Sequence, residues 1–334
     1  MILAAMASSF AFPVVITNPA AVSRVLMNGV YRVYPLTKMY TAALCEGNFL
    51  SLLLFIVISL VLFAVFAVAL GRFFKHLNTA FTTSRTRSNY RMTTLRASPV
   101  LDALYRRELR RYFSSALYVL NTGIGMVLAL IMSVALLFFK PAQLEAILEM
   151  PGFASVIGTL APMVLAVLVC MSCTTGCSVS IEGKSFWIIK SLPVRAEMIF
   201  LSKIMVNLTV TIPLSLICAL FLAVALPMSP AQILFLFLTP AVFAVLSAEA
   251  GLLLNLLHPN FTWTNEAVVI KQSMPSILSI LGGIVSVAFT VGLAMLPPYL
   301  KTAGLAALTF LIAVVDGLLY RLLKTKGAGL FQRL

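Results

Sequence analysis

Long stretches without a single charged residue recur along the whole chain, and they limit its fold more than any other feature. Residues 49–71 and 204–248 are examples. A helix of about 20 apolar residues crosses the roughly 30 Å hydrocarbon core of a bilayer. Only 10% of the residues are charged, against about 25% in soluble domains. We therefore expect an all-α, polytopic bundle of membrane-spanning helices.

The apolar runs separate into about eight segments. The segment 204–248 is too long for one helix, and Leu226-Pro227-Met228-Ser229-Pro230 divides it. The expected spans are about 2–17, 49–71, 115–139, 156–181, 205–226, 232–256, 275–296 and 303–323.

Lysine and arginine predict the orientation of these spans. Residues 72–111 carry ten of them, and the loops on the same side bring the number to nineteen, against five on the other side. Because cytoplasmic loops carry the excess of basic residues, both termini are expected in the cytoplasm. This topology also accounts for the net charge of +14, which gives no indication of nucleic-acid binding.

Residues 98–113, SPVLDALYRRELRRYF, have the pattern of an amphipathic helix. Ser98 is a suitable cap, and Pro99 suits the first helical position. Such a helix is typical of the cytoplasmic headgroup layer, in contact with membrane lipid; the alternative is a basic stretch that only sets topology. Residues 18–48 on the external side leave two similar readings, an interfacial or re-entrant helix and an ordinary loop.

Residues 181–194, IEGKSFWIIKSLPV, look at first like the end of a phosphate-binding loop. That motif needs a glycine five residues before Gly183, where this chain has Ser178. The stretch reads better as a short cytoplasmic helix whose aromatic residues dock onto another protein; the alternative places Trp187 at the membrane interface. The next cytoplasmic loop, 258–275, has a similar mixture of Trp263, Glu266 and Lys271.

Two acidic residues, Glu249 and Asp316, fall within expected spans, where ionisable groups are costly and indicate function or a hydrogen bond inside the bundle. Cys170, Cys173 and Cys177 would share one face of a helix, as small residues at a helix contact more plausibly than as metal ligands. The two histidines, His76 and His258, have no patterned catalytic partner. We expect neither a catalytic set nor a metal site.

Three stretches resemble the permease subunits of bacterial ABC-2 type exporters: ELRRYFSSALYVLNT (108–122), IEGKSFWIIKSLPVRAEMIFLSKIMVNL (181–208) and LHPNFTWTNEAVVIKQS (257–273). The resemblance extends from about residue 40 to the C-terminus, and the second stretch is the most specific.

The resemblance implies six spans per permease half, an elbow helix before the first span, and a coupling helix that contacts a separate ATPase. Residues 115–334 would form one half, 72–114 a basic linker with the elbow helix, and 1–71 the last two spans of a preceding half around an external loop at 18–48. The chain would then be a truncated or misannotated form of a two-half permease, and a second permease chain would complete it. A bacterial plasma membrane is the implied location.

The resemblance assigns roles to three sets of residues. The coupling residues are Glu182, Gly183, Lys184, Phe186, Trp187, Lys190 and Pro193; the elbow residues are Tyr105, Arg106, Arg107, Arg110 and Arg111; the second cytoplasmic loop contributes Trp263, Asn265, Glu266 and Lys271. Replacing Glu182 by arginine, or Trp187 by alanine, is expected to uncouple ATP hydrolysis from transport without loss of the protein from the membrane.

The expected function is therefore a transmembrane permease subunit of an ATP-driven exporter. This chain would hold no cofactor and hydrolyse nothing, and ATP and Mg²⁺ would bind to the partner ATPase. Two alternatives remain open: an ion-coupled secondary transporter that uses Glu249 and Asp316, and a membrane scaffold or fragment that transports nothing. The cargo is not predicted.

Overall fold

A computed structural model describes residues 34–82, 98–138, 153–271 and 298–334, together with the single residues 27, 30, 31 and 292. These residues are helical or connect helices, and no strand occurs among them. They fall into two compact units, one within residues 13–97 and the other running from Ser98 to Leu334. The expectation of an all-α fold is confirmed for this part of the chain.

Six helices in the described ranges are long and apolar enough to cross a membrane, so the chain has the character of a multi-pass membrane protein. They are α4 (Phe49–Thr82), α6 (Ala116–Phe138), α8 (Phe153–Met171), α10 (Ala196–Ala225), α11 (Pro230–Leu257) and α14 (Pro298–Leu322). Each overlaps an expected span. The expected spans 2–17 and 275–296 lie outside the described residues, so the number eight stays a prediction.

The predicted break near residue 228 is confirmed. Helix α10 ends at Ala225 and α11 begins at Pro230. The Ser229 side chain accepts a hydrogen bond from the backbone N–H of Gln232, and the Gln232 side chain accepts one from Ser229 N–H. This reciprocal cap fixes the start of α11, with proline at its first position.

The first unit contains α3 (Leu36–Cys45) and α4, whose apolar stretch Phe49–Phe74 has no buried residue within the chain. The ring of Tyr40 packs against Phe55 at 5.4 Å. Part of the stretch 18–48, predicted to be external, is therefore helical. Its interfacial or re-entrant placement stays a prediction, and most of residues 18–33 lie outside the described residues.

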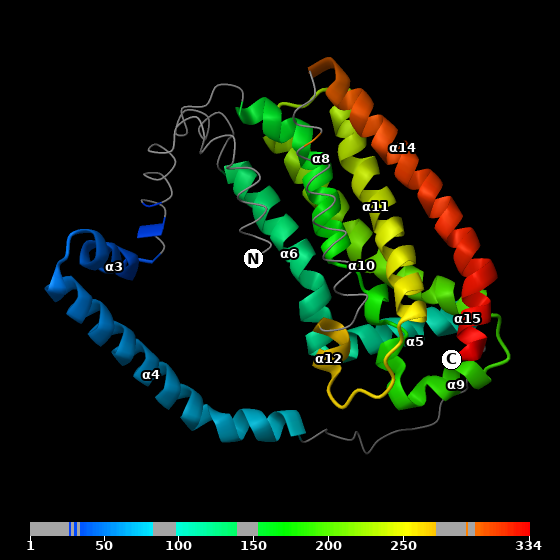
Figure 1. Ribbon diagram of the computed structural model, residues 1–334, viewed down its shortest axis with the longest axis horizontal. Helices are drawn as coiled ribbons and strands as arrows, with labels where there is room; N and C mark the ends of the chain where they lie inside the picture. Colours follow the sequence, from blue (N-terminus) through cyan, green and yellow to red (C-terminus); the bar gives the residue numbers. More distant parts are fainter. Residues whose placement is uncertain are drawn as a thin grey trace. The chain divides into compact units, whose positions relative to one another are not determined.

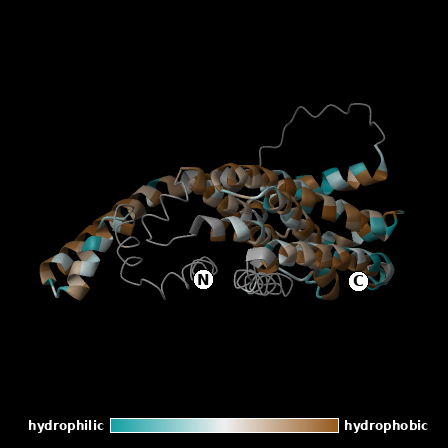
Figure 2. Ribbon diagram, turned by 90° about the horizontal axis from the view of Figure 1, so that it is seen from above, coloured by the Kyte–Doolittle hydropathy of each residue, from teal (hydrophilic) through white to brown (hydrophobic). Residues whose placement is uncertain are grey.

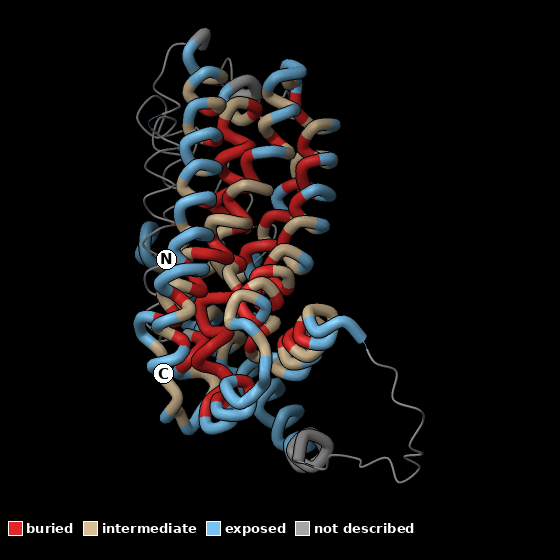
Figure 3. The backbone as a smooth tube through the Cα atoms, turned by 90° about the vertical axis from the view of Figure 1, so that its right-hand side faces the viewer, coloured by how far each residue is buried: buried red, intermediate tan, exposed pale blue. Residues whose placement is uncertain are grey.

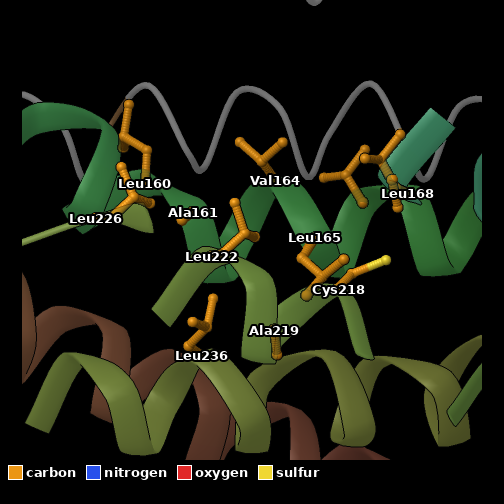
Figure 4. Close-up of a cluster of buried hydrophobic side chains, with 12 residues drawn as sticks. Leu160, Ala161, Val164, Leu165, Leu168, Cys218, Ala219, Leu222, Leu226 and Leu236 are labelled. Atoms are coloured by element: carbon orange, nitrogen blue, oxygen red, sulfur yellow. The ribbon is translucent and has the colours of Figure 1, made fainter. Parts of the chain in front are cut away.

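In the second unit α6, α8, α10, α11 and α14 lie side by side, and the short helices gather at one end of this bundle (Figure 1). The long helices are predominantly hydrophobic along their length (Figure 2). Buried residues run through the interior, and exposed ones face outward (Figure 3). One apolar cluster joins Leu165 and Leu168 of α8 to Leu222 of α10 and Leu236 of α11 (Figure 4).

The predicted amphipathic helix is α5 (Val100–Ser114), which runs crosswise to the long helices at the end of the bundle (Figure 1). Leu104, Glu108 and Tyr112 are buried at four-residue spacing, so one face of the helix packs against the bundle. Its arginines lie on the remaining sides. The same end carries α9 (Phe186–Ser191), α12 (Glu266–Lys271) and α15 (Ala328–Arg333).

Candidate functional site

The chain leaves α8 earlier than the sequence predicted. Helix α8 ends at Met171, whereas the expected span continued to residue 181. The residues that follow, 172–185, are here called the connector; they contain two 3₁₀ turns, η1 (Thr175–Cys177) and η2 (Ser180–Ser185). Residues 174–183 are all buried. Irregular backbone is tolerated in such a place only when protein groups satisfy its N–H and C=O groups.

Two asparagines supply much of that satisfaction. Asn207 of α10 accepts hydrogen bonds from the Thr174 N–H (2.7 Å) and hydroxyl (3.0 Å) through its Oδ1 atom. Asn255 of α11 accepts from the N–H groups of Val179 (2.7 Å) and Ser180 (3.0 Å). Both amides are fully buried. They therefore act as caps for a connector that contains only short 3₁₀ turns and no α-helix.

Side chains from α6, α10 and the loop before α12 donate hydrogen bonds to carbonyl groups of the connector. The Tyr118 hydroxyl donates to Thr174 O at 2.5 Å, and Trp263 Nε1 donates to Ser180 O at 2.7 Å. Lys203 Nζ donates to Ser178 O at 2.8 Å. The connector is therefore held by α6, α10, α11 and the loop before α12, so its position depends on all of them.

A charge network of Glu108, Glu182, Lys203, Arg107 and Arg111 lies beside the connector. Lys203 Nζ of α10 is 2.8 Å from Glu108 Oε2 of α5 and 3.3 Å from Glu182 Oε1 of the connector. The three side chains are almost without solvent exposure, at 1%, 6% and 0%. A single ammonium group thus joins an acid from the crosswise helix to an acid from the connector.

The two arginines complete the network from the side of α5. Arg107 Nη2 lies 2.9 Å from Glu182 Oε2, and its Nη1 lies 3.1 Å from Glu108 Oε1. Arg111 forms a further ion pair with Glu182. Burial alone would lower the pKa of Arg111, but the ion pair with Glu182 and the charge of Glu108 raise it above its ordinary value. Arg111 is therefore expected to stay charged inside the network.

Such a network fixes the relative positions of its elements. Buried charges are stable only when opposite charges and hydrogen bonds replace water, and removing one partner costs about 3–5 kcal/mol. Here three cations surround two carboxylates from α5 and the connector. Helix α5, the connector and the start of α10 should therefore move as one body.

Part of the expected coupling surface is buried, and this corrects the sequence prediction. Glu182, Gly183 and Phe186 face the interior, and Glu182 is 3% exposed. Gly183 has a φ of +53°, and an added Cβ would lie 3.0 Å from the indole of Trp263. The side chains of Glu182 and Phe186 are already engaged within the chain, so they support the exposed part of the expected coupling surface from behind.

The remaining coupling residues do form an exposed surface, here called the α9 face. Trp187 is 67% exposed and Ile188 43%. The α9 face consists of Lys184, Trp187, Ile188, Lys190, Leu192 and Pro193, all of them exposed. It combines an indole, which is a group enriched at protein interfaces, with aliphatic side chains and two lysines.

An aromatic cluster supports the α9 face from the inside. Phe186 stacks on Phe261 with 4.6 Å between ring centroids and contacts Phe331 of α15 edge-on at 5.3 Å. Phe331 also packs against Phe200 of α10 at 5.7 Å. The loop after α11 and the C-terminal helix are thus held against α9 from within the same chain.

The expected elbow residues have two different roles. Arg107 and Arg111 belong to the buried network, whereas Arg110 is exposed and Arg106 pairs with Asp102 of the same helix at 3.0 Å. Tyr105 shares a hydrogen bond of 2.9 Å with Thr209 of α10. Half of the basic face therefore binds the bundle, and half remains free for another surface.

Residues of the loop 258–275, which the sequence predicts to be cytoplasmic, also have structural contacts. Glu266 accepts a hydrogen bond of 2.6 Å from Ser115, at the turn between α5 and α6, and the Asn265 side chain accepts one from Ala267 N–H at the start of α12. The indole of Trp263 holds the connector. The side chain of Lys271 lies outside the description.

The three cysteines do not share one helix face as predicted, because α8 ends between them at Met171. Cys170 Sγ contacts Phe243 O at 3.7 Å and Cys173 Sγ contacts Ser247 O at 3.1 Å, so both meet α11, whereas Cys177 turns back to Thr174 O. Contact between helices, one of the readings, is confirmed for Cys170, whereas Cys173 meets α11 from the connector. No group of three possible metal ligands occurs among the described residues.

The acidic residues in α11 and α14 are both buried, Glu249 to 4% exposure and Asp316 to 9%. One carboxyl oxygen of each, Glu249 Oε2 and Asp316 Oδ1, has no hydrogen-bond partner in the described structure. They therefore differ from Glu108 and Glu182, which are equally buried but fully paired.

The bundle also contains an apolar pocket of about 350 Å³ between α6, α8 and α10. Met132, Leu136 and Ile157 are among its lining residues, and Ser133 uses its hydroxyl on the Ala129 carbonyl of its own helix. The pocket could accept only an apolar group without leaving polar atoms unpaired.

Sequence reasoning did not identify Glu108, Lys203, Asn207 and Asn255 as functional residues. In the sequence, these residues stand out only as an acid, a lysine or an amide at the edge of an otherwise apolar run. Such residues also occur at membrane interfaces, so this signal does not distinguish the two cases. Compared with protein-family models, curated proteins and solved structures, the chain matches none.

Proposed function

We propose that the chain is the transmembrane permease subunit of an ATP-driven exporter, as its resemblance to ABC-2 type permeases implies. The observation that carries the proposal is the α9 face: an exposed indole and Lys190 on a short helix, with Lys184 just before it, on a support that is tied from behind to the membrane bundle. An exposed surface on a rigid support suits a site that receives force from a partner. In this proposal the partner is a cytoplasmic ABC ATPase, which binds ATP and Mg²⁺.

The charge network gives a physical route for that force. Movement of α9 pulls on the connector, which directly precedes α9 in the chain and lies in the interior. Because Glu182 is paired with α10 through Lys203 and with α5 through Arg107, the connector cannot move without these helices. ATP-driven closure of the ATPase would thus reorient α5, the proposed elbow helix, together with α10.

The apolar pocket favours an apolar cargo, such as lipid, over a polar one.

Capture of the partner tests the docking step. The tagged chain is purified from its native cells in mild detergent, and co-purifying proteins are identified by mass spectrometry. We expect a stoichiometric P-loop ATPase that is lost when Trp187 and Lys190 are both replaced by alanine. The matched control is Leu300→Ala with Lys301→Ala, an apolar residue and a lysine at the opposite end of the bundle, which should retain the ATPase. Recovery of the chain alone would contradict the proposal.

Transport provides a second test. Membrane vesicles from cells that lack the partner ATPase should show no ATP-dependent export, whereas vesicles that contain both proteins should. The Trp187→Ala variant should leave ATP hydrolysis uncoupled from transport while the protein stays in the membrane. Export that persists without the ATPase would refute the assignment.

One observation favours a second candidate, an ion-coupled secondary transporter. The buried oxygens of Glu249 and Asp316 lack partners in the described structure, and unpaired intramembrane acids are typical of ion pathways. In that case Glu249→Gln would abolish gradient-driven uptake, and ATP depletion would have no direct effect. The α9 face would then have no role in transport, so its alanine variants distinguish the two candidates.

A further inference from the structure

We propose that Glu249 and Asp316 form a reversible proton-binding site between α11 and α14. The proposal concerns the ligand of this pair, and it holds whether ATP or an ion gradient drives transport. Its basis is a contrast within one chain between two kinds of buried carboxyl group.

Glu108 and Glu182 show how this protein buries carboxylates as ions. Each has ion pairs with Lys203 and with arginines at hydrogen-bond distance. Glu249 and Asp316 are buried to a similar degree, at 4% and 9% exposure, but no ion pair or hydrogen bond to either side chain occurs among the described residues. A carboxyl group in such a place avoids the cost of a bare charge by binding a proton.

Among the described residues, no cation forms an ion pair with either acid. Helices α11 and α14 pack against each other, and Thr239 of α11 shares a hydrogen bond of 2.9 Å with Thr309 of α14. Glu249 lies ten residues beyond the first and Asp316 seven residues beyond the second. The titratable groups near them in the described structure are the thiols of Cys170 and Cys173, which approach α11 from α8 and the connector. Two like charges on adjacent helices would repel, so ionisation of one acid favours retention of the proton by the other.

The same arrangement argues for a proton over a metal cation. Ca²⁺ takes six to eight oxygen ligands and Mg²⁺ about six. No cluster of three or more metal-binding side chains occurs in the described ranges. Two carboxyl groups are enough for a proton, and it is the ligand that the site as described can hold.

Hydrogen bonds link the segment of α11 around Glu249 to the connector. Thr175 Oγ1 donates a hydrogen bond of 2.7 Å to Ala248 O, directly before Glu249, and Cys173 contacts Ser247 O. Asn255 lies on the same helix and caps the connector at Val179 and Ser180. A change in the spacing of α11 and α14 that follows proton release would therefore reach the residues that hold Glu182 in place.

Infrared spectroscopy of the full chain in lipid nanodiscs tests the proposal. At neutral pH the wild-type protein should show the C=O band of a protonated carboxyl group, which shifts in D₂O and disappears reversibly as the pH is raised. The band should be lost or halved in Glu249→Gln and in Asp316→Asn, and absent in the double variant. Asp102→Asn, an exposed carboxylate on α5, is the control and should leave the band unchanged.

Two results would overturn the proposal: no protonated band that depends on either acid, or a band that neither exchanges nor titrates, which would indicate a permanently trapped proton. If a variant fails to fold, the wild-type chain can be labelled with dicyclohexylcarbodiimide in its place. This apolar reagent modifies protonated carboxyl groups. Modification of Glu249 or Asp316 supports the site, whereas modification of Glu108 and Glu182 in their place contradicts it. Neither readout requires the ATPase, so its absence would not affect the result.

Discussion

Replacing Glu182 by alanine should destabilise the protein strongly, although sequence reasoning placed this residue on a docking surface. Its side chain is 0% exposed and is paired with Arg107 at 2.9 Å, with Lys203 at 3.3 Å and with Arg111. The substitution leaves three cations around Glu108 alone. Breaking a buried network in this way costs about 3–5 kcal/mol. Glu182→Gln keeps the volume and one acceptor, so its effect should be smaller.

The free energy of unfolding can be measured by steric trapping in mild detergent micelles. The matched control is Asp102→Ala, because Asp102 pairs with Arg106 at 3.0 Å on the surface of the same region, where the two side chains are 36% and 66% exposed. Loss of this exposed pair and of one acid in the first turn should cost under about 1 kcal/mol. A double-mutant cycle with Lys203→Ala should give a coupling energy of roughly 0.5–3 kcal/mol.

The reasoning is refuted if Glu182→Ala unfolds within roughly 0.5 kcal/mol of the Asp102→Ala control, the range of ordinary surface substitutions. If it holds, Glu182→Arg reports on folding and cannot serve as a test of ATPase coupling. Trp187→Ala, at an exposed position, is then the informative docking variant.

Three further substitutions test the packing around the connector by the same unfolding assay. Gly183→Ala should lower the free energy of unfolding by about 1–3 kcal/mol, because the φ of Gly183 is +53° and the new methyl group would lie 3.0 Å from Trp263. The control Gly317→Ala, in a helix with open space around the position, should be neutral or stabilising. Equal effects of the two substitutions would contradict the strain argument. Asn255→Leu should cost about 1–3 kcal/mol for each of the two buried N–H groups that it leaves unpaired, and a loss below 1 kcal/mol would show that other groups replace the amide. Gly251→Ala should cost about 1–3 kcal/mol because its Cβ would lie 2.7 Å from Thr175 Oγ1, and a neutral result would mean that α11 can move away from the connector.

The limits of sequence reasoning are clearest in the stretch 172–185. Its uncharged composition predicted a helix to residue 181, because hydropathy measures only whether a segment can be buried. The helix ends at Met171 since Asn207 and Asn255, more than thirty positions away, bond the backbone groups of the connector in place of helical carbonyls. Partners so distant in the chain leave no local pattern, so neither the connector nor its caps could be predicted.

The sequence by itself determined that this protein lies in a lipid bilayer and that its elements are helices. Uncharged runs long enough to span a bilayer require helices, because the backbone N–H and C=O groups of a helix bond to each other. The proline-rich break at 226–230 sets where α11 begins, and the spacing of apolar residues in α5 sets which face packs against the bundle. These properties are local, so one sequence is enough to predict them. Tertiary structure decided which charged residues are available to a partner. Glu182 and Trp187 lie five residues apart, but the approach of α5 and α10 buries the first in ion pairs and leaves the second exposed.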